Sequence, residues 1–113
     1  MSSREYYPTA SDIIATALGA GSQSDWFEVS QNLYHTFYID LSAIGVNISF
    51  RFEHSRDKVK TYNVNVNNED SILTKNGNYS YWFNGVRLPW IRLNFVSANG
   101  GTPLIDFSYF GGR

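Results

Sequence analysis

The chain has 113 residues, a length typical of one domain, and 42% of them are hydrophobic, which is enough for a sizeable core. Charged residues make up only 17% and the net charge is −1, so charge alone would attract neither a nucleic-acid backbone nor an anionic membrane. The absence of cysteine excludes disulfides and thiolate metal sites. Aromatic residues make up 17%, a high share that indicates a surface reserved for contact with another molecule.

The N-terminal region carries no apolar segment of the secretory type, and no run reaches the roughly 18–20 apolar residues that span a bilayer. We therefore expect a soluble protein made in a cytoplasm. Ser11 and Asp12 could cap a short helix from Ile13 to Leu18, but the same segment also fits a strand or extended arm. We favour the latter because a two-turn helix buries little. The predicted organisation is an N-terminal arm with a candidate first strand in residues 1–24, followed by a sandwich domain in residues 25–113.

Most of the remaining chain alternates between apolar and polar residues, as in a strand with one buried face. The alternating segments are 37–41, 46–53, 62–67, 90–95 and 104–110. Alternation favours antiparallel sheet, since buried parallel strands are continuously apolar. Asn84-Gly85 predicts a hairpin between 81–83 and 86–88, and Asn99-Gly100-Gly101 separates the last two segments.

These patterns predict an all-β fold, an antiparallel, jelly-roll-like β-sandwich of about seven or eight strands with an extended N-terminal arm. The predicted core consists of the inward-facing residues of the alternating segments. They are Phe37, Ile39, Ile48, Phe50, Val64, Tyr81, Ile91, Leu93, Phe95, Ile105 and Phe107.

No motif in the sequence predicts catalysis, a cofactor or a metal site, and we expect the chain not to be an enzyme. His35 and His54 lie in different segments without an accompanying nucleophile, so we expect two surface histidines. The oxygen-rich segment 67–71 lacks the ligand spacing of a calcium loop and is predicted to be a solvated turn. If residues 97–102 close a hairpin, Arg92 and Asp106 would form a cross-strand ion pair.

The aromatic residues give the strongest functional signal. Strand parity places Trp82, Trp90, Leu104 and Phe110 opposite the core residues of their segments. These residues could form a contact surface for another protein. Alternatively, the N-terminal segment covers them, or the predicted parity is wrong by one residue and they point into the core. In the predicted arm, the adjacent Tyr6 and Tyr7 would give a large contact area on a neighbouring subunit.

A family resemblance is carried by residues 76–95. There a G-x-Y-x-Y segment, Gly77-Asn78-Tyr79-Ser80-Tyr81, is followed by Trp90-Ile91-Arg92-Leu93 and later by a glycine-rich turn and a last apolar strand. This layout resembles small bacteriophage virion β-sandwich proteins. The resemblance implies a structural protein located in the virion, which decorates a capsid as a cement protein or joins tail subunits. The implied partners are other virion proteins and further copies of the same chain in a homo-oligomer. Neither nucleic acid nor a membrane is an expected partner.

The chain also resembles discoidin-like and carbohydrate-binding sandwiches, which implies an alternative function as a carbohydrate-binding or receptor-binding module. Sugar recognition would use the rings of Trp26, Trp82 and Trp90 as stacking platforms with polar side chains beside them. Coplanar rings beside polar groups would favour sugar. A flat apolar patch would favour protein.

Overall fold

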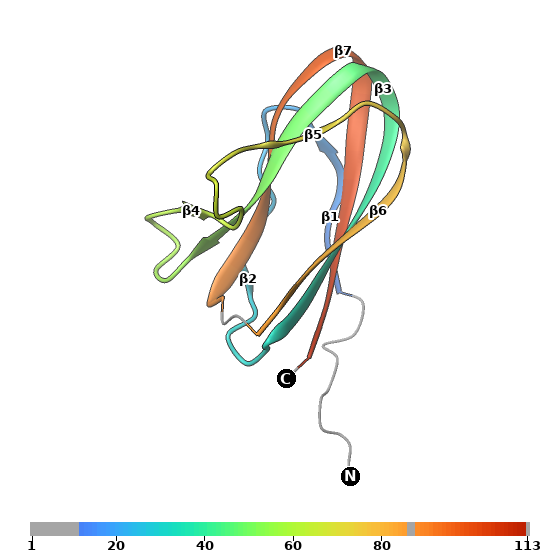
Figure 1. Ribbon diagram of the computed structural model, residues 1–113. Helices are drawn as coiled ribbons and strands as arrows, with labels where there is room; N and C mark the ends of the chain where they lie inside the picture. Colours follow the sequence, from blue (N-terminus) through green and yellow to red (C-terminus); the bar gives the residue numbers. More distant parts are fainter. Residues whose placement is uncertain (1–11, 86–87, 113) are drawn as a thin grey trace.

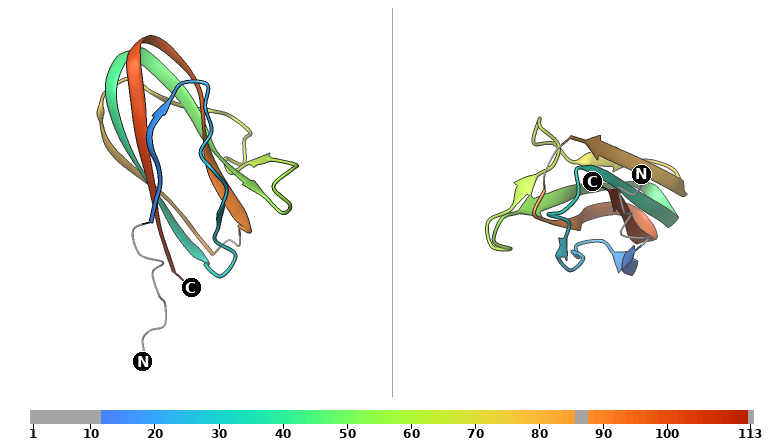
Figure 2. Two further views of the ribbon diagram at one scale, coloured as in Figure 1. Left: turned by 180° about the vertical axis from the view of Figure 1, so that it is seen from behind. Right: turned by 90° about the horizontal axis from the view of Figure 1, so that it is seen from below.

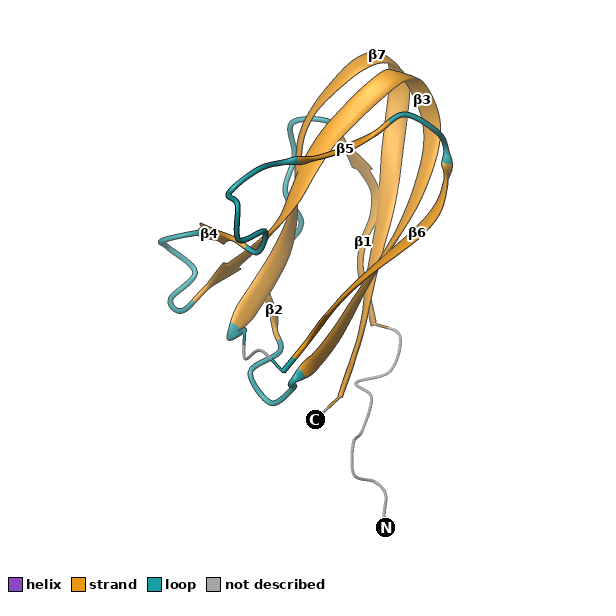
Figure 3. Cartoon of the chain, viewed as in Figure 1, coloured by secondary structure: helices purple, strands orange, loops and turns teal. Residues whose placement is uncertain are grey.

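The described part of the chain consists of strands and loops (Figure 3). The computed structural model describes residues 12–85 and 88–112. The strands are β1 (Asp12–Gly19), β2 (Phe27–Glu28), β3 (Tyr34–Ser55), β4 (Tyr62–Asn63), β5 (Ser71–Leu73), β6 (Gly77–Asn84) and β7 (Trp90–Gly112). All pairings are antiparallel, which confirms the predicted all-β antiparallel fold, and the segment Ile13–Leu18 is part of a strand. No helix in the described ranges is long and apolar enough to cross a membrane.

The two long strands β3 and β7 pair along nearly their whole length and bend together near their middles (Figure 1). At the bend the register shifts between Ser42 and Ile44 and again between Ile44 and Asn47. A Cβ atom on Gly45 would lie 2.3 Å from the carbonyl carbon of Gly100, so only glycine fits there. The bend folds the sheet onto itself, and the rings of Phe37 and Phe52, which belong to one strand, meet with centroids 4.4 Å apart.

The bend produces a sandwich of two layers. Layer 1 contains β1, the C-terminal half of β7, the N-terminal half of β3 and β6, in that order. Layer 2 contains β2, the N-terminal half of β7 and the C-terminal half of β3, with β4 and β5 paired to β3. Seen from behind, β1 and the segment leading to β2 both lie along β7 (Figure 2).

Two pairings and the length of one strand differ from those that the sequence predicts. Asn84-Gly85 does not close a hairpin, because β6 and β7 flank β3 on opposite sides. Residues 97–102 lie within the continuous strand β7, so Arg92 and Asp106 do not face each other. Arg92 is paired with Glu53 and Asp106 with Asp40, both in β3. The strand predicted at 62–67 ends at Asn63, and the following residues form turns.

The core lies between the layers. Nine of the eleven predicted core residues are buried, while Val64 and Tyr81 are only partly buried and pack against the others. The buried apolar residues are Val29, Phe37, Ile39, Leu41, Ile48, Phe50, Phe52, Leu88, Ile91, Leu93, Phe95, Ile105, Phe107 and Tyr109.

His35 belongs to the core as well, which corrects its predicted surface position. Its Nδ1 atom lies 2.7 Å from the hydroxyl oxygen of Tyr109, and the Asn32 side-chain amide donates a hydrogen bond to the same oxygen at 3.1 Å. Burial raises the pKa of Tyr109 to about 12. The histidine points between the layers because it has the same parity in β3 as Phe37 and Ile39, and Tyr109 of β7 satisfies its ring nitrogen there.

The outer face of layer 2 is held by a charged network centred on the buried carboxylate of Glu53. Arg92 Nε donates to Glu53 Oε1 at 2.8 Å, and Arg51 Nε donates to Oε2 at 3.0 Å. Asn94 adds a third hydrogen bond at 3.1 Å. Burial alone would raise the pKa of Glu53, but the hydrogen bonds from Asn94 and Arg92 and the charges of Arg92 and Arg51 outweigh it, so its pKa lies below the usual value.

Replacing Leu93 with alanine should lower the free energy of unfolding by about 2–5 kcal/mol, because the side chain is fully buried between the layers. Urea unfolding measures the change. Val59→Ala is the control: Val59 is 82% exposed and its truncation should change stability by no more than about 0.5 kcal/mol. Equal stability of Leu93→Ala and the parent would contradict the described core.

Glu53 should make the fold sensitive to acid. Because the pKa of Glu53 is lower in the folded state, its contribution to the free energy of unfolding is complete above the unfolded-state pKa of about 4.3. This contribution disappears as the pH falls through the pKa of the folded state. Glu53→Gln should therefore be less stable than the parent at neutral pH, and the difference should shrink at about pH 3. Urea unfolding at both pH values measures this, with the exposed Glu69→Gln as control. A difference that is the same at both pH values would contradict the assignment.

Candidate functional site

The outer face of layer 1 carries a group of exposed apolar side chains, which we call the aromatic face. Its members come from β1, β3, β6 and β7 and are 38–75% exposed. They are Ile13, Tyr34, Tyr38, Trp82, Leu104 and Phe110. Together they account for more than half of the large hydrophobic residues that are exposed in the described ranges.

The strand register places these side chains in adjacent rows. Thr36 of β3 is paired with Trp82 of β6 on one side and with Phe110 of β7 on the other. Directly opposed residues of antiparallel strands point to the same face, so the two rings flank the small threonine. In the next row Tyr38 lies between two serines, and Ser108 is paired in turn with Ile13 of β1. The rows therefore form one continuous surface.

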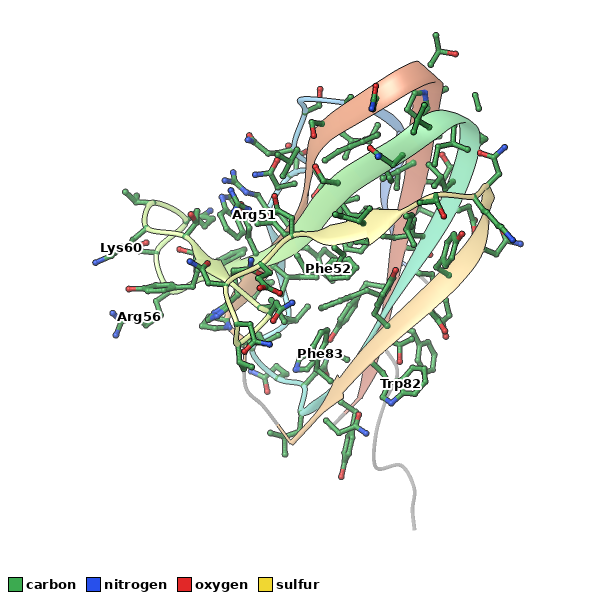
Figure 4. The ribbon with its side chains drawn as sticks, turned by 45° about the horizontal axis from the view of Figure 1, so that its top comes forward. Arg51, Phe52, Arg56, Lys60, Trp82 and Phe83 are labelled. Atoms are coloured by element: carbon green, nitrogen blue, oxygen red, sulfur yellow. The ribbon has the colours of Figure 1, made fainter. Side chains whose placement is uncertain are left out.

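Side chains along β6 alternate between the aromatic face and the interior of the sandwich. Side chains at even positions are exposed on the aromatic face, and those at odd positions are partly buried between the layers. Trp82 points away from the sandwich, whereas its neighbour Phe83 points between the layers (Figure 4). The exposed fraction of Trp82 is 65%. A tryptophan this exposed, beside other exposed rings, marks a contact surface more often than a solvated one.

In the described ranges, charged groups of this face lie in one row, between Leu104 and the row of Tyr38. There Asp40 is paired with Asp106 and with Asn78. Asp106 also accepts a hydrogen bond from the backbone N–H of Ala17 at 2.7 Å, which ties β1 to the sheet. The rows containing Trp82 and Tyr38 hold only aromatic, aliphatic and hydroxyl side chains. The two outer faces thus differ: layer 2 is covered by its own ion pairs and layer 1 is not.

The structure places the predicted contact residues in three environments. Trp82, Leu104 and Phe110 lie on the aromatic face. Trp90 points to the outer face of layer 2, where the Lys58 Nζ atom lies 4.4 Å from the centre of its ring. Tyr6 and Tyr7 lie outside the described residues.

Sequence reasoning missed Ile13, Tyr34 and Tyr38. The two tyrosines follow the same parity rule as Trp82, since each alternates with a core residue of β3. Ile13 could be placed only through its pairing with Ser108, which is distant in the sequence.

The three tryptophans do not form a common sugar platform. Trp82 belongs to layer 1, while Trp26 is covered by the guanidinium group of Arg92, 4.4 Å from the ring centre. Trp90 is covered by Lys58 in the same way. Cations over the ring faces are themselves stabilising and occupy the surface that a sugar would need.

A pocket of about 560 Å³ opens between the layers beside β6. Its apolar lining includes Phe52, Tyr81, Phe83 and Leu88. Figure 4 shows Phe52 and Phe83 between the layers. Burial, and to a smaller extent the neighbouring Tyr79, raises the pKa of Tyr81.

Polar side chains line the layer 2 side of the same pocket. They are Arg51, His54, Asn63, Asn65, Glu69 and Ser71. His54 stacks on the ring of Tyr62 with centroids 5.6 Å apart, and burial lowers its pKa. Its Nδ1 atom is buried and has no hydrogen-bond partner among the described residues. In the described ranges no three His, Asp or Glu side chains are grouped as metal ligands.

No protein-family model and no curated protein matches the sequence. Solved structures that share the fold include three from different classes of protein. The SPBc2 prophage-derived protein YomS has a TM-score of 0.68 and 12% identity, and the match covers 100% of this chain and 99% of YomS. A protein of the Bacillus endospore appendages, which form disulfide-linked pili, has a TM-score of 0.55 and 15% identity over 96% of this chain and 88% of that one.

The third structure is the carbohydrate-binding module CBM4, with a TM-score of 0.53 and 7% identity over 96% of this chain and 86% of that one. Sequence identities this low establish the shared fold and nothing about the partner or ligand. The β-sandwich architecture of this chain thus occurs in a prophage-derived protein, in a pilus protein and in a carbohydrate-binding module.

Proposed function

We propose that the chain is a non-enzymatic structural protein of a virion, which decorates or joins capsid or tail subunits through its aromatic face. The observation that carries this proposal is the continuous surface formed by Trp82, Phe110, Tyr34 and Tyr38. Burying one aromatic side chain completely is worth about 1.5–3 kcal/mol, so covering this surface would be strongly favourable. The prophage origin of YomS, which has the same fold, supports a phage context.

The shape and chemistry of the aromatic face favour a protein partner. Its centre consists of the rows of Trp82 and Tyr38, which hold no charged residue, and Asp40 and Asp106 lie in the row beyond Tyr38. The cores of protein interfaces are similarly enriched in aromatic residues and depleted in charge. The outer face of layer 2 differs, because hydrogen bonds from Arg51 and Arg92 to Glu53 satisfy its charged groups within the chain.

The predicted N-terminal arm fits the same arrangement. β1 begins at Asp12, which is paired with Tyr109, the neighbour of Phe110 in β7. We propose that Tyr6 and Tyr7 of this arm extend the contact with a neighbouring subunit.

Trp82→Ser and Phe110→Ser, made separately, should each weaken binding to a virion subunit by about tenfold or more, because each removes a ring from the centre of the interface. The measurement is binding of the purified protein to particles of the phage that encodes it. Ile72→Ser is the matched control, since Ile72 on β5 is 66% exposed, close to the 65% of Trp82, but lies outside the aromatic face.

Binding should also change little with salt, because the net charge is −1 and the centre of the surface is uncharged. The proposal fails if both serine variants, confirmed to be folded, bind particles as the parent does. It also fails if the protein neither binds such particles nor is found in them.

A second candidate function is sugar binding in the pocket between the layers. The pocket combines the rings of Tyr81 and Phe83 with the side-chain amides of Asn63 and Asn65, a pairing of stacking surface with hydrogen-bonding groups that suits a sugar ring. Its volume of 560 Å³ falls within the range of about 300–1,000 Å³ typical of ligand pockets.

A glycan array distinguishes the two functions. If the pocket binds sugar, the parent should bind specific glycans, Phe83→Ala should lose them, and Trp82→Ser should keep them. No binding by the parent, or binding that depends on Trp82 and not on Phe83, would exclude the pocket as a sugar site.

A further inference from the structure

Strand β6 forms a long free edge of the sheet. It spans Gly77–Asn84 and pairs with β3 through eight consecutive residue pairs without a register shift. On its other side none of the strands in the described ranges is paired with it, and Figure 1 shows it along the margin of layer 1. A regular unpaired edge presents a row of N–H and C=O groups to which another strand can add.

The orientation of these backbone groups follows from one hydrogen bond. Gly85 N–H donates to the carbonyl oxygen of Leu33 at 2.8 Å, in the same register as the β6–β3 pairs. Hydrogen-bonded pairs alternate along an antiparallel ladder, so the odd residues of β6 bond to β3. The backbone groups of the even residues, Asn78, Ser80, Trp82 and Asn84, therefore point away from the sheet.

The other edges of the sandwich are unsuited to pairing with another chain. β1 has two register shifts, and Ala17 within it has a positive φ of 53° and gives its N–H to Asp106. β2 and β4 have two residues each and β5 has three. Bulges and short strands are common protections against edge-to-edge association. β6 has neither, and its eight residues include no proline and no charged residue.

We propose that two copies of this chain associate through β6, in antiparallel pairing about a two-fold axis centred on Tyr81. This register pairs Asn78 with Asn84 of the partner subunit and Ser80 with Trp82 of the partner subunit. It matches every outward backbone N–H of the even residues with a carbonyl group. A two-fold axis perpendicular to the sheet keeps the even side chains of both copies on the same surface.

The side chains favour a second β6 as the occupant of this edge. The strand carries no charge, so two copies do not repel each other, and the large Trp82 ring lies beside a small serine across the pair. Among the strands of the described ranges, only β6 combines this length and regularity with a free edge. The pairing joins two aromatic faces into one surface of twice the width.

The register gives a sharp test. Because Asn78 faces Asn84 of the partner subunit, the double variant N78K/N84K places two pairs of like charges at the new interface. The matched variant N78K/N84E places opposite charges at the same positions. Both changes are at exposed positions, and both variants carry the same lysine beside Asp40 within the subunit.

Analytical ultracentrifugation of the purified protein over a range of concentrations measures the association. The parent should form a dimer, N78K/N84K should raise the dissociation constant about tenfold, and N78K/N84E should restore dimerisation. Ser80→Pro, which removes an outward N–H, should also weaken the dimer if it folds, and Ser80→Ala should not. Added salt should reduce the difference between the two lysine variants.

A parent that stays monomeric at its highest soluble concentration overturns the proposal. So does a dimer on which N78K/N84K and N78K/N84E have the same effect, because the pairing would then use another register or surface. The dimer and the proposed virion contact are separable through Phe110→Ser, since Phe110 lies on β7 and away from the β6 edge. This variant should dimerise like the parent even where it no longer binds particles.

Discussion

The close approach of two backbones at the bend of β3 and β7 determines the rest of the structure. Gly45 lies against the backbone of Gly100 and Gly101, and a Cβ atom on Gly45 or Gly101 would come within 2.3–2.7 Å of neighbouring backbone atoms. Gly100 and Gly101 also have positive φ values of 79° and 72°. Because the two strands turn together here, one sheet becomes two layers, and each long strand contributes an inner and an outer face to both.

The same bend separates the chemistry of the two outer faces. The C-terminal half of β3 supplies Arg51 and Glu53 to layer 2, where buried and charge-assisted hydrogen bonds satisfy the polar groups within the chain. The N-terminal half of β3 supplies Tyr34 and Tyr38 to layer 1, where the aromatic face remains exposed. One outer face is therefore complete in the monomer, and the other has the composition of an interface.

Local patterns in the sequence predicted the strands and the residues on their buried faces. They did not predict which strands pair with each other. Parity correctly identified strands and nine buried core residues, because a side chain's face follows from its position in a strand. Asn84-Gly85 predicted a hairpin that does not form, because a turn sequence does not specify which strands pair. Here β3 lies between β6 and β7. Parity also places His35 on the inner face with Phe37, but its hydrogen-bond partner Tyr109 is 74 residues away, and the cation over Trp90 belongs to Lys58 in a loop. No local pattern contains these contacts.

The position of β7 has a consequence for the order of events during synthesis. β7 follows the other described strands in the chain, yet it pairs with β1, β2 and β3. Until β7 has been synthesised, β1 and β2 therefore lack the strand with which they pair. Completion of the sandwich waits for β7 and proceeds through contacts between segments distant in sequence, which is a slow route.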